Sequence, residues 1–214
     1  IKELASTTTH QLSDSGVAHE FNINIKLNNL LINSLRKTNQ LNKTSEYTLD
    51  YDNQVIATQK YDSKKTYKKC DGYQSGVATI GKHIVYIEGR NGNSPAKYKQ
   101  DETLGRTFSL LEDNNIKIKR LRADSASYQK RVIDLAIQKN TQFYIRATRC
   151  ASMEQQIGAI AESDWEKERL GCQQMEIAHI QYNPFGGKDS YRLVVSRIER
   201  KDKQIDVFTG KAYM

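Results

Sequence analysis

The segment EYTLDYDNQVIAT, residues 46–58, is the first clear β-strand pattern of the chain. Leu49, Tyr51 and Val55 alternate with Asp50 and Asp52, as in a strand that buries one face. Asp50 and Asp52 are two residues apart, so both carboxylates project from the same face of that strand. The segment therefore predicts a sheet strand that carries two acids on one side.

Two further strands follow this segment, at Val77–Ile80 and His83–Glu88, and the turn Gly81-Lys82 joins them. Three successive strands are most simply an antiparallel meander. The apolar residues then recur at helical spacing, which predicts a helix over Lys97–Asp113.

The next elements predict parallel pairing. Ile116–Asp124 is a predicted strand, Ser125 or Ser127 can cap the helix after it, and Thr141–Ala147 is the next strand. A strand–helix–strand unit with short loops has parallel strands and a right-handed crossover. The resulting order, β-β-β-α-β-α-β, is that of a ribonuclease H-like mixed α/β sheet.

Three regions are predicted from these patterns. Residues 1–45 form an N-terminal segment with one amphipathic helix around Leu27–Leu35, and residues 46–150 form the ribonuclease H-like core. Residues 151–214 hold a short helix, Ala151–Ala161, and an antiparallel β region. Its predicted strands are Met175–Tyr182, Tyr191–Ile198 and Gln204–Phe208.

Composition excludes several classes of protein. The 214 residues include 33 Lys and Arg against 25 Asp and Glu, a formal charge of +8, and no apolar run is long enough to span a membrane. The three cysteines lack C-x-x-C spacing, which argues against a disulfide framework or a zinc ribbon and favours a reducing cytoplasm.

The positive charge is clustered. The densest cluster interleaves lysines with Tyr61 and Tyr67, and the others lie near residues 120 and 200; a solvated face is the plain alternative. Lysine and arginine neutralise phosphates, and tyrosine can stack on unpaired bases, so the clusters favour a nucleic-acid partner. The members are Lys60, Lys64, Lys65, Lys68, Lys69; Lys117, Lys119, Arg120, Arg122; and Arg197, Arg200, Lys201, Lys203.

Asp124 ends its predicted strand, at the edge where open α/β sheets bind ligands. If the strand of Asp52 is its neighbour, the two carboxylates lie side by side and repel each other unless a cation lies between them. Mg²⁺ prefers oxygen ligands of this kind. The alternatives are that Asp50 and Asp52 form the polar face of a half-exposed strand, and that Asp124 caps the following helix.

Four motifs occur in order along the chain: LDYDNQVI (49–56), GRNGNS (89–94), RADSASY (122–128) and YRLVVSR (191–197). Together they resemble DDE-type transposases of bacterial insertion sequences, in the group with a β insertion before the helix that bears the catalytic Glu. The fold of that family is also ribonuclease H-like. The resemblance implies an enzyme that cuts DNA at the element ends and then joins the freed 3′-hydroxyl to target DNA.

The resemblance also assigns roles. Asp52 and Asp124 become the catalytic residues that bind Mg²⁺ (or Mn²⁺), with Asp50 as the alternative to Asp52. Arg122 holds a phosphate or forms a surface salt bridge, and Trp165 stacks on a DNA base or packs against the β insertion. DNA, as transposon ends and target, is the implied partner, in a homodimer. The DNA-contacting residues are Lys64, Lys65, Lys68, Lys69, Arg120 and Trp165.

One family feature is absent. The third carboxylate of the family lies in a Tyr-x-x-Arg-x-x-x-Glu pattern, which this sequence lacks, and Glu154 and Glu162 are the fallback candidates. The sequence therefore resembles a shortened member of the family. A DNA-binding module without catalysis is one alternative function. Another is a β-rich interaction domain with incidental aspartates, which requires that the Glu46 and Ile116 strands are not neighbours.

Overall fold

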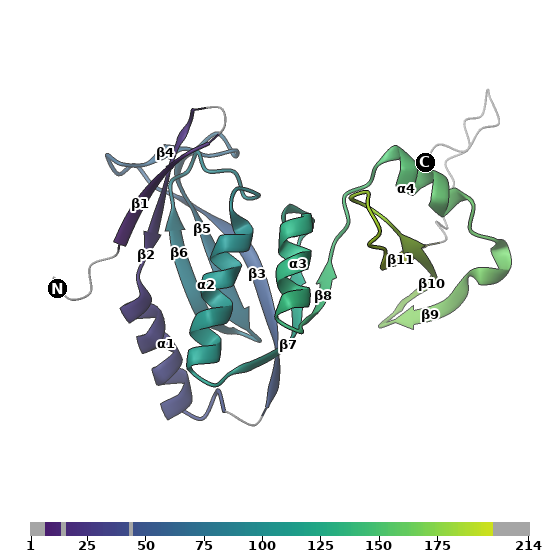
Figure 1. Cartoon of the computed structure of the whole chain (residues 1–214), viewed down its shortest axis with the longest axis horizontal. Helices are drawn as coiled ribbons and strands as arrows, with labels where there is room; N and C mark the ends of the chain where they lie inside the picture. Colours follow the sequence, from purple (N-terminus) through teal and green to yellow (C-terminus); the bar gives the residue numbers. More distant parts are fainter. Residues whose placement is uncertain (1–6, 14–15, 43–44, 199–214) are drawn as a thin grey trace. The chain divides into compact units, whose positions relative to one another are not determined.

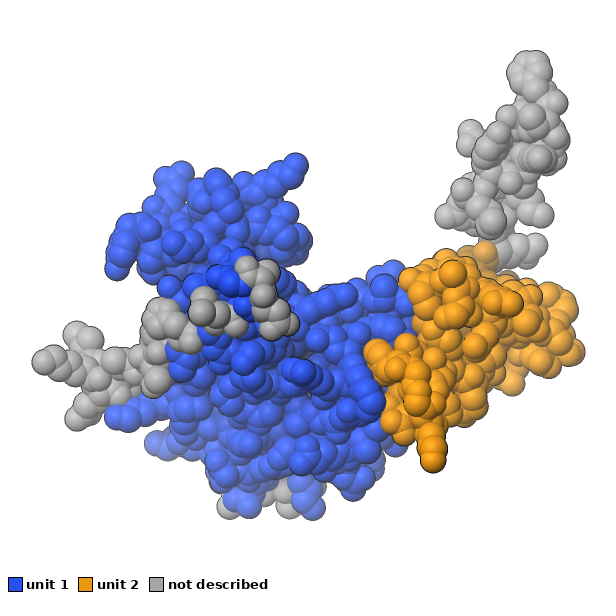
Figure 2. Space-filling view, turned by 45° about the horizontal axis from the view of Figure 1, so that its top comes forward, with its two compact units in different colours: residues 1–148 blue, residues 149–214 orange. Residues whose placement is uncertain are grey.

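A computed structural model describes residues 7–13, 16–42 and 45–198 of the chain. The chain divides into two compact units, residues 1–148 and 149–214, which Figure 2 shows in different colours. None of the helices in the described ranges combines the length and the apolar character needed to cross a membrane.

The first unit is built on a mixed sheet of eight described strands, in the order β1-β2-β6-β5-β3-β7-β8, with β4 beside β5. The pairs β3–β5 and β5–β6 are antiparallel, whereas β3–β7 and β7–β8 are parallel. The predicted meander and parallel additions are confirmed, and the core is ribonuclease H-like. The bounds are β1 (Thr7–Leu12), β2 (Ala18–Ile23), β3 (Glu46–Ala57), β4 (Lys64–Lys65), β5 (Asp71–Ile80), β6 (His83–Arg90), β7 (Lys117–Ala123) and β8 (Gln142–Ile145).

Three helices lie over one face of this sheet: α1 (Ile25–Lys37), α2 (Gln100–Asp113) and α3 (Lys130–Gln138) (Figure 1). Leu49 of β3 is fully buried in the same core as Leu104 of α2 and Val132 of α3. Burying one such side chain contributes about 1.5–3 kcal/mol. Because side chains alternate along β3, the neighbouring acids project from the opposite face.

The segment before residue 46 holds more than the predicted helix. Strands β1 and β2 form an antiparallel pair, and β2 joins the sheet by pairing Phe21 with Arg90 of β6. The sequences TTTHQL and AHEFNI show no sustained alternation. Their strand structure comes from pairing with residues distant in sequence, which local patterns do not report.

Strand β5 begins at Asp71, six residues before the predicted start at Val77. Glycines hide the strand pattern in this stretch. A Cβ atom at Gly76 would lie 2.5 Å from the Tyr51 hydroxyl, so the close approach of β3 and its buried tyrosine requires glycine at that position.

The turn after β7 differs from the prediction. Ser125–Ser127 form a 3₁₀ turn, and α3 begins at Lys130 with Gln129 as its N-cap. The predicted capping by Ser125 or Ser127 is therefore wrong. Instead, Asp124 caps the 3₁₀ turn, because its Oδ1 accepts a hydrogen bond of 3.0 Å from the Ala126 N–H.

The second unit contains α4 (Ala151–Gly158) and an antiparallel sheet in the order β11-β10-β9. Strands β10 (Gln173–Tyr182) and β11 (Tyr191–Arg197) confirm the predicted hairpin. Strand β9 (Glu166–Leu170) was not predicted, because its sequence EKERL is fully exposed and lacks an apolar face. The predicted strand Gln204–Phe208 lies outside the described residues.

Candidate active site

Asp52 and Asp124 come together where the parallel pairing of β3 and β7 ends. Asp52 lies within β3, which continues to Ala57, and Asp124 directly follows the last residue of β7. The parallel register of β3 and β7 pairs Asp50 with Arg122 and Tyr51 with Ala123, so Asp52 and Asp124 follow directly after the last pair. Neighbouring strands lie about 4.8 Å apart. The predicted adjacency is confirmed. The hypothesis of a β-rich interaction domain with non-adjacent strands is therefore wrong.

Both carboxylates are exposed and already oriented. Asp52 accepts hydrogen bonds from the Asn53 N–H at 2.7 Å and from Gln54 Nε2 at 2.6 Å, and Asp124 accepts from Ala126 N–H. Neither forms an ion pair with a lysine or arginine anywhere in the described ranges. Two adjacent carboxylates without a cationic partner are a donor set that suits a hard, oxygen-preferring divalent cation.

Asp50 has a different environment from Asp52. Arg122 donates to it in bidentate geometry, with Nε–Oδ1 at 2.5 Å and Nη2–Oδ2 at 2.8 Å. These hydrogen bonds raise the pKa of the Arg122 guanidinium. Arg122 thus forms the expected surface salt bridge, and Asp50 is less available to a metal ion than Asp52 is.

A chain of hydrogen bonds beneath the site links the two acidic segments. Gln100, the first residue of α2, is fully buried and donates from Nε2 to Asn53 Oδ1 at 3.0 Å. Gln129 Nε2 donates to Gln100 Oε1 at 3.3 Å and to the Ala126 carbonyl at 2.9 Å. Asn53 and Ala126 are also the residues whose N–H groups bind Asp52 and Asp124. No local sequence pattern identifies Gln100 as a site residue, because its partners are distant along the chain.

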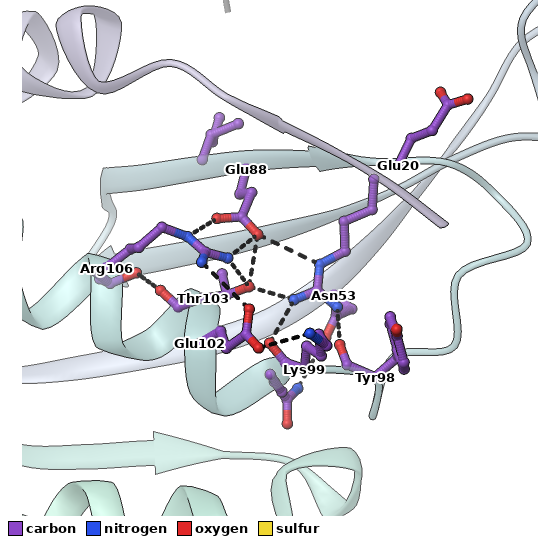
Figure 3. Close-up of polar contacts among 12 residues, drawn as sticks. Glu20, Asn53, Glu88, Tyr98, Lys99, Glu102, Thr103 and Arg106 are labelled. Carbon is purple, nitrogen blue, oxygen red and sulfur yellow. Dashed lines mark hydrogen bonds and ion pairs between the residues drawn. The ribbon is translucent and has the colours of Figure 1, made fainter. Parts of the chain in front are cut away.

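Deeper in the same unit lies a buried ionic cluster. Figure 3 shows Glu88, Thr103 and Arg106 pointing toward one another. Glu88 is fully buried and accepts from Arg106 Nε and Nη2, both at 2.9 Å, from Thr103 Oγ1 at 2.7 Å and from the Tyr86 hydroxyl at 2.9 Å. Burial and the adjacent Glu88 carboxylate raise the pKa of Tyr86. The cluster joins β6 to α2.

Arg90, in the GRNGNS motif, fixes the loop between β6 and α2. Its side chain is buried, lies 4.9 Å over the Phe21 ring, and donates from Nη1 to the Tyr98 carbonyl at 2.7 Å. It also hydrogen-bonds Thr103 of α2. This arginine therefore holds both ends of the loop that borders the two acids.

The predicted DNA-contacting residues have different surroundings. Lys65 lies in β4 and forms an ion pair of 3.0 Å with Asp71, whereas Lys64, Lys68, Lys69 and Arg120 are exposed. Trp165 belongs to the second unit, where the Arg197 guanidinium lies 4.2 Å over its ring. The remaining basic residues near position 200 lie outside the described ranges.

No third carboxylate joins the pair among the described residues of the first unit, where no group of three metal-ligating side chains occurs. Both fallback candidates belong to the second unit. Arg197 binds Glu162, which lowers the pKa of that carboxyl group, and Arg149 lies 3.4 Å from Glu154.

The first unit is a ribonuclease H-like sheet in which two carboxylates lie side by side where the parallel pairing of β3 and β7 ends, an arrangement that suits a metal-dependent nuclease. The sequence matches the transposase DDE domain, group 1, over residues 2–210, so the chain belongs to this family of transposases. The transposase function expected from the sequence is confirmed.

Solved structures with a similar fold include transposases. The catalytic domain of Mos1 mariner transposase is 11% identical, with 71% of this chain and 76% of that chain covered and a TM-score of 0.37. A structure of that domain with raltegravir and manganese is 12% identical, with the same coverage of both chains and a TM-score of 0.36. A piggyBac transposase synaptic complex with hairpin DNA is 12% identical, with 86% of this chain and 41% of that chain covered and a TM-score of 0.38. No curated protein matches this chain in sequence.

Proposed function

We propose that Asp52 and Asp124 hold Mg²⁺, or Mn²⁺ in its place, for DNA strand cleavage and transfer at transposon ends. The observation that supports this most strongly is the adjacency of two exposed carboxylates that no lysine or arginine of the described ranges neutralises. Asp50 is the weaker candidate, because Arg122 already occupies both of its oxygens.

Asp52 and Asp124 would hold the divalent ion, which would supply polarisation of the scissile phosphate and activation of the attacking oxygen. The protein contributes orientation. The Asn53 N–H and Gln54 amide fix the Asp52 carboxylate, and the Ala126 N–H fixes that of Asp124. Exposed Lys64, Lys68, Lys69 and Arg120 neutralise the DNA backbone.

The remaining assignments follow the family resemblance. We propose residues 46–150 as the catalytic core, residues 151–214 as the β insertion with Trp165 near the DNA, and a homodimer on paired ends as the working assembly. Cys70, Cys150 and Cys172 are free thiols, which supports action in the reducing cytoplasm.

A second candidate function is a DNA-binding module that does not cut. It is favoured by the absence of a third carboxylate beside Asp52 and Asp124 among the described residues of the first unit. The exposed lysines suffice for binding in this case.

The test is nicking of supercoiled plasmid DNA in Mn²⁺. Asp52→Asn and Asp124→Asn are each expected to lower the nicking rate by about 100-fold or more, since even residues that only orient metal ligands contribute about 10–100-fold. Asp113→Asn, an exposed acid at the end of α2, is the matched control and should leave the rate unchanged. Salt-sensitive DNA binding without nicking would favour the second candidate function. A protein that neither binds nor nicks DNA would contradict both candidate functions.

A further inference from the structure

A cavity of about 570 Å³ adjoins the two acids. Asp52 and Asp124 form one side, Lys65 and Tyr67 form another, and the loop 92–96 between β6 and α2 borders the rest. The cavity is therefore assembled from β3, β7, the β4 region and the loop that Arg90 fixes.

Buried polar groups without partners line this cavity. Ser94 is 1% exposed, and its Oγ has no hydrogen-bond partner in the described ranges. Gln74 is 2% exposed, lines the cavity, and its amide likewise forms no hydrogen bond within those ranges. Buried polar groups are nearly always hydrogen-bonded, so the Ser94 hydroxyl left open at this cavity indicates a ligand with a complementary polar group, and the Gln74 amide at the same cavity is available to the same ligand.

The wall of the cavity is rigid where it meets the β4 region. A Cβ atom at Gly92 would lie 2.3 Å from the Lys64 carbonyl oxygen and 2.4 Å from the Gly72 carbonyl oxygen. The loop is thus pressed against the two strands, and only glycine fits at this position. Such a wall keeps Ser94 in place before any ligand binds, which lowers the entropy cost of binding.

Tyr67 offers a flat surface at the mouth. Its side chain is 69% exposed and lines the cavity, with Lys68 Nζ 5.8 Å from the ring centroid. Tyr61, in the same lysine-rich segment, is fully exposed and does not line the cavity. The two tyrosines therefore form a matched pair for experiment.

We propose that this cavity binds one unpaired base of the DNA strand whose phosphate lies at Asp52 and Asp124. The inference rests on the proposed function, which brings a phosphodiester to the two acids. Gln74 and Ser94 present the hydrogen-bonding groups that read base edges, and Tyr67 provides a face for stacking. A base inside a duplex stacks on its neighbouring bases and cannot stack on Tyr67, so the bound base must be extruded or single-stranded.

The test compares two single-stranded DNA probes of eight nucleotides with equal charge, one with thymine bases and one fully abasic, by fluorescence anisotropy in Ca²⁺. The wild-type chain is expected to bind the thymine probe about five-fold or more tightly, as stacking on an aromatic side chain contributes at least that factor per base. Tyr67→Ala should bring the ratio close to one, and Gln74→Leu and Ser94→Ala should lower it. Tyr61→Ala should leave it unchanged.

Equal binding of both probes by the wild type would overturn the inference, as would an equal loss in Tyr61→Ala and Tyr67→Ala. Because Tyr67 is exposed, Tyr67→Ala does not disturb the packing of the core, and the variant is expected to fold. A wild type that nicks plasmid DNA but ignores the bases contradicts only the base pocket. A wild type that prefers the thymine probe but does not nick contradicts only the catalytic proposal.

Discussion

Asp52 lies beside Asp124 because β3 and β7 are parallel neighbours in a register that ends one residue before both acids. The two carboxylates are 72 positions apart in the sequence, and only the crossover through α2 brings them together. Their side chains are oriented by N–H groups of the residues that follow them. The geometry of the candidate metal site is therefore a property of the sheet, and residues that fix the two strands should affect metal binding.

Gln100 is the first such residue. Gln100→Met keeps the volume of the side chain but removes its hydrogen bonds to Asn53 and Gln129, so Mn²⁺ affinity should fall by about 10-fold. Electron paramagnetic resonance of free Mn²⁺ measures this. Thr107→Val is the matched control, because Thr107 is equally buried in α2 but bonds only to its own helix, at Thr103. Equal affinity of both variants would contradict the positioning role.

The buried cluster around Glu88 should dominate stability. Glu88→Gln leaves the buried Arg90 and the Arg106 guanidinium without their anion, so the free energy of unfolding should fall by about 3 kcal/mol. Urea denaturation measures the change. Glu112→Gln, which removes an exposed partner of Lys139 outside the cluster, should cost less than about 1 kcal/mol. Similar losses of unfolding free energy in the two variants would contradict the dominant contribution of the cluster to stability.

Salt dependence separates the lysines. For duplex DNA, Lys68→Met should reduce the slope of log K against log salt by about 0.9, the contribution of one neutralised phosphate. Lys65→Met should reduce it less, because Asp71 already binds Lys65 at 3.0 Å. Filter binding over a range of salt concentrations gives both slopes. An unchanged slope in Lys68→Met would remove this lysine from the DNA-contacting set.

Cys150 should be the most reactive thiol at neutral pH. Hydrogen bonds from the Ser152 and Tyr182 hydroxyls lower its pKa to about 7. Since the thiolate reacts, the alkylation rate should rise with pH through about 7 and level off above it. Mass spectrometry after iodoacetamide treatment reads Cys150 and Cys172 separately. Ser152→Ala should move the inflection upward, and an inflection near 8.5 in the wild type would contradict the assignment.

Much of this arrangement was predictable from local patterns. Alternation identified β3, and the strand–helix–strand order identified the parallel neighbour that carries Asp124. The strands at Thr7–Leu12 and Glu166–Leu170 were not predicted, because their sequences lack an alternation of apolar residues. They are strands because they pair with other strands.

The supporting residues of the site were also missed. Gln100 lies in a predicted helix, but its partner Asn53 is 47 residues away, so no local pattern reports the contact. Glu88 lies in a predicted strand. The alternation of that strand does not show that Arg106 neutralises Glu88 or that Thr103 donates a hydrogen bond to it. Such contacts arise only when distant elements pack.

The most direct measurement is the position of Mn²⁺ in crystals of the protein, from its anomalous scattering. A peak is expected within about 2.0–2.6 Å of carboxylate oxygens of both Asp52 and Asp124, the range for divalent ions with oxygen ligands. Asp52→Asn should lose the peak, and Asp50→Asn should keep it. A peak at Asp50, or none near Asp124, would contradict the proposal that Asp52 and Asp124 together bind the metal ion.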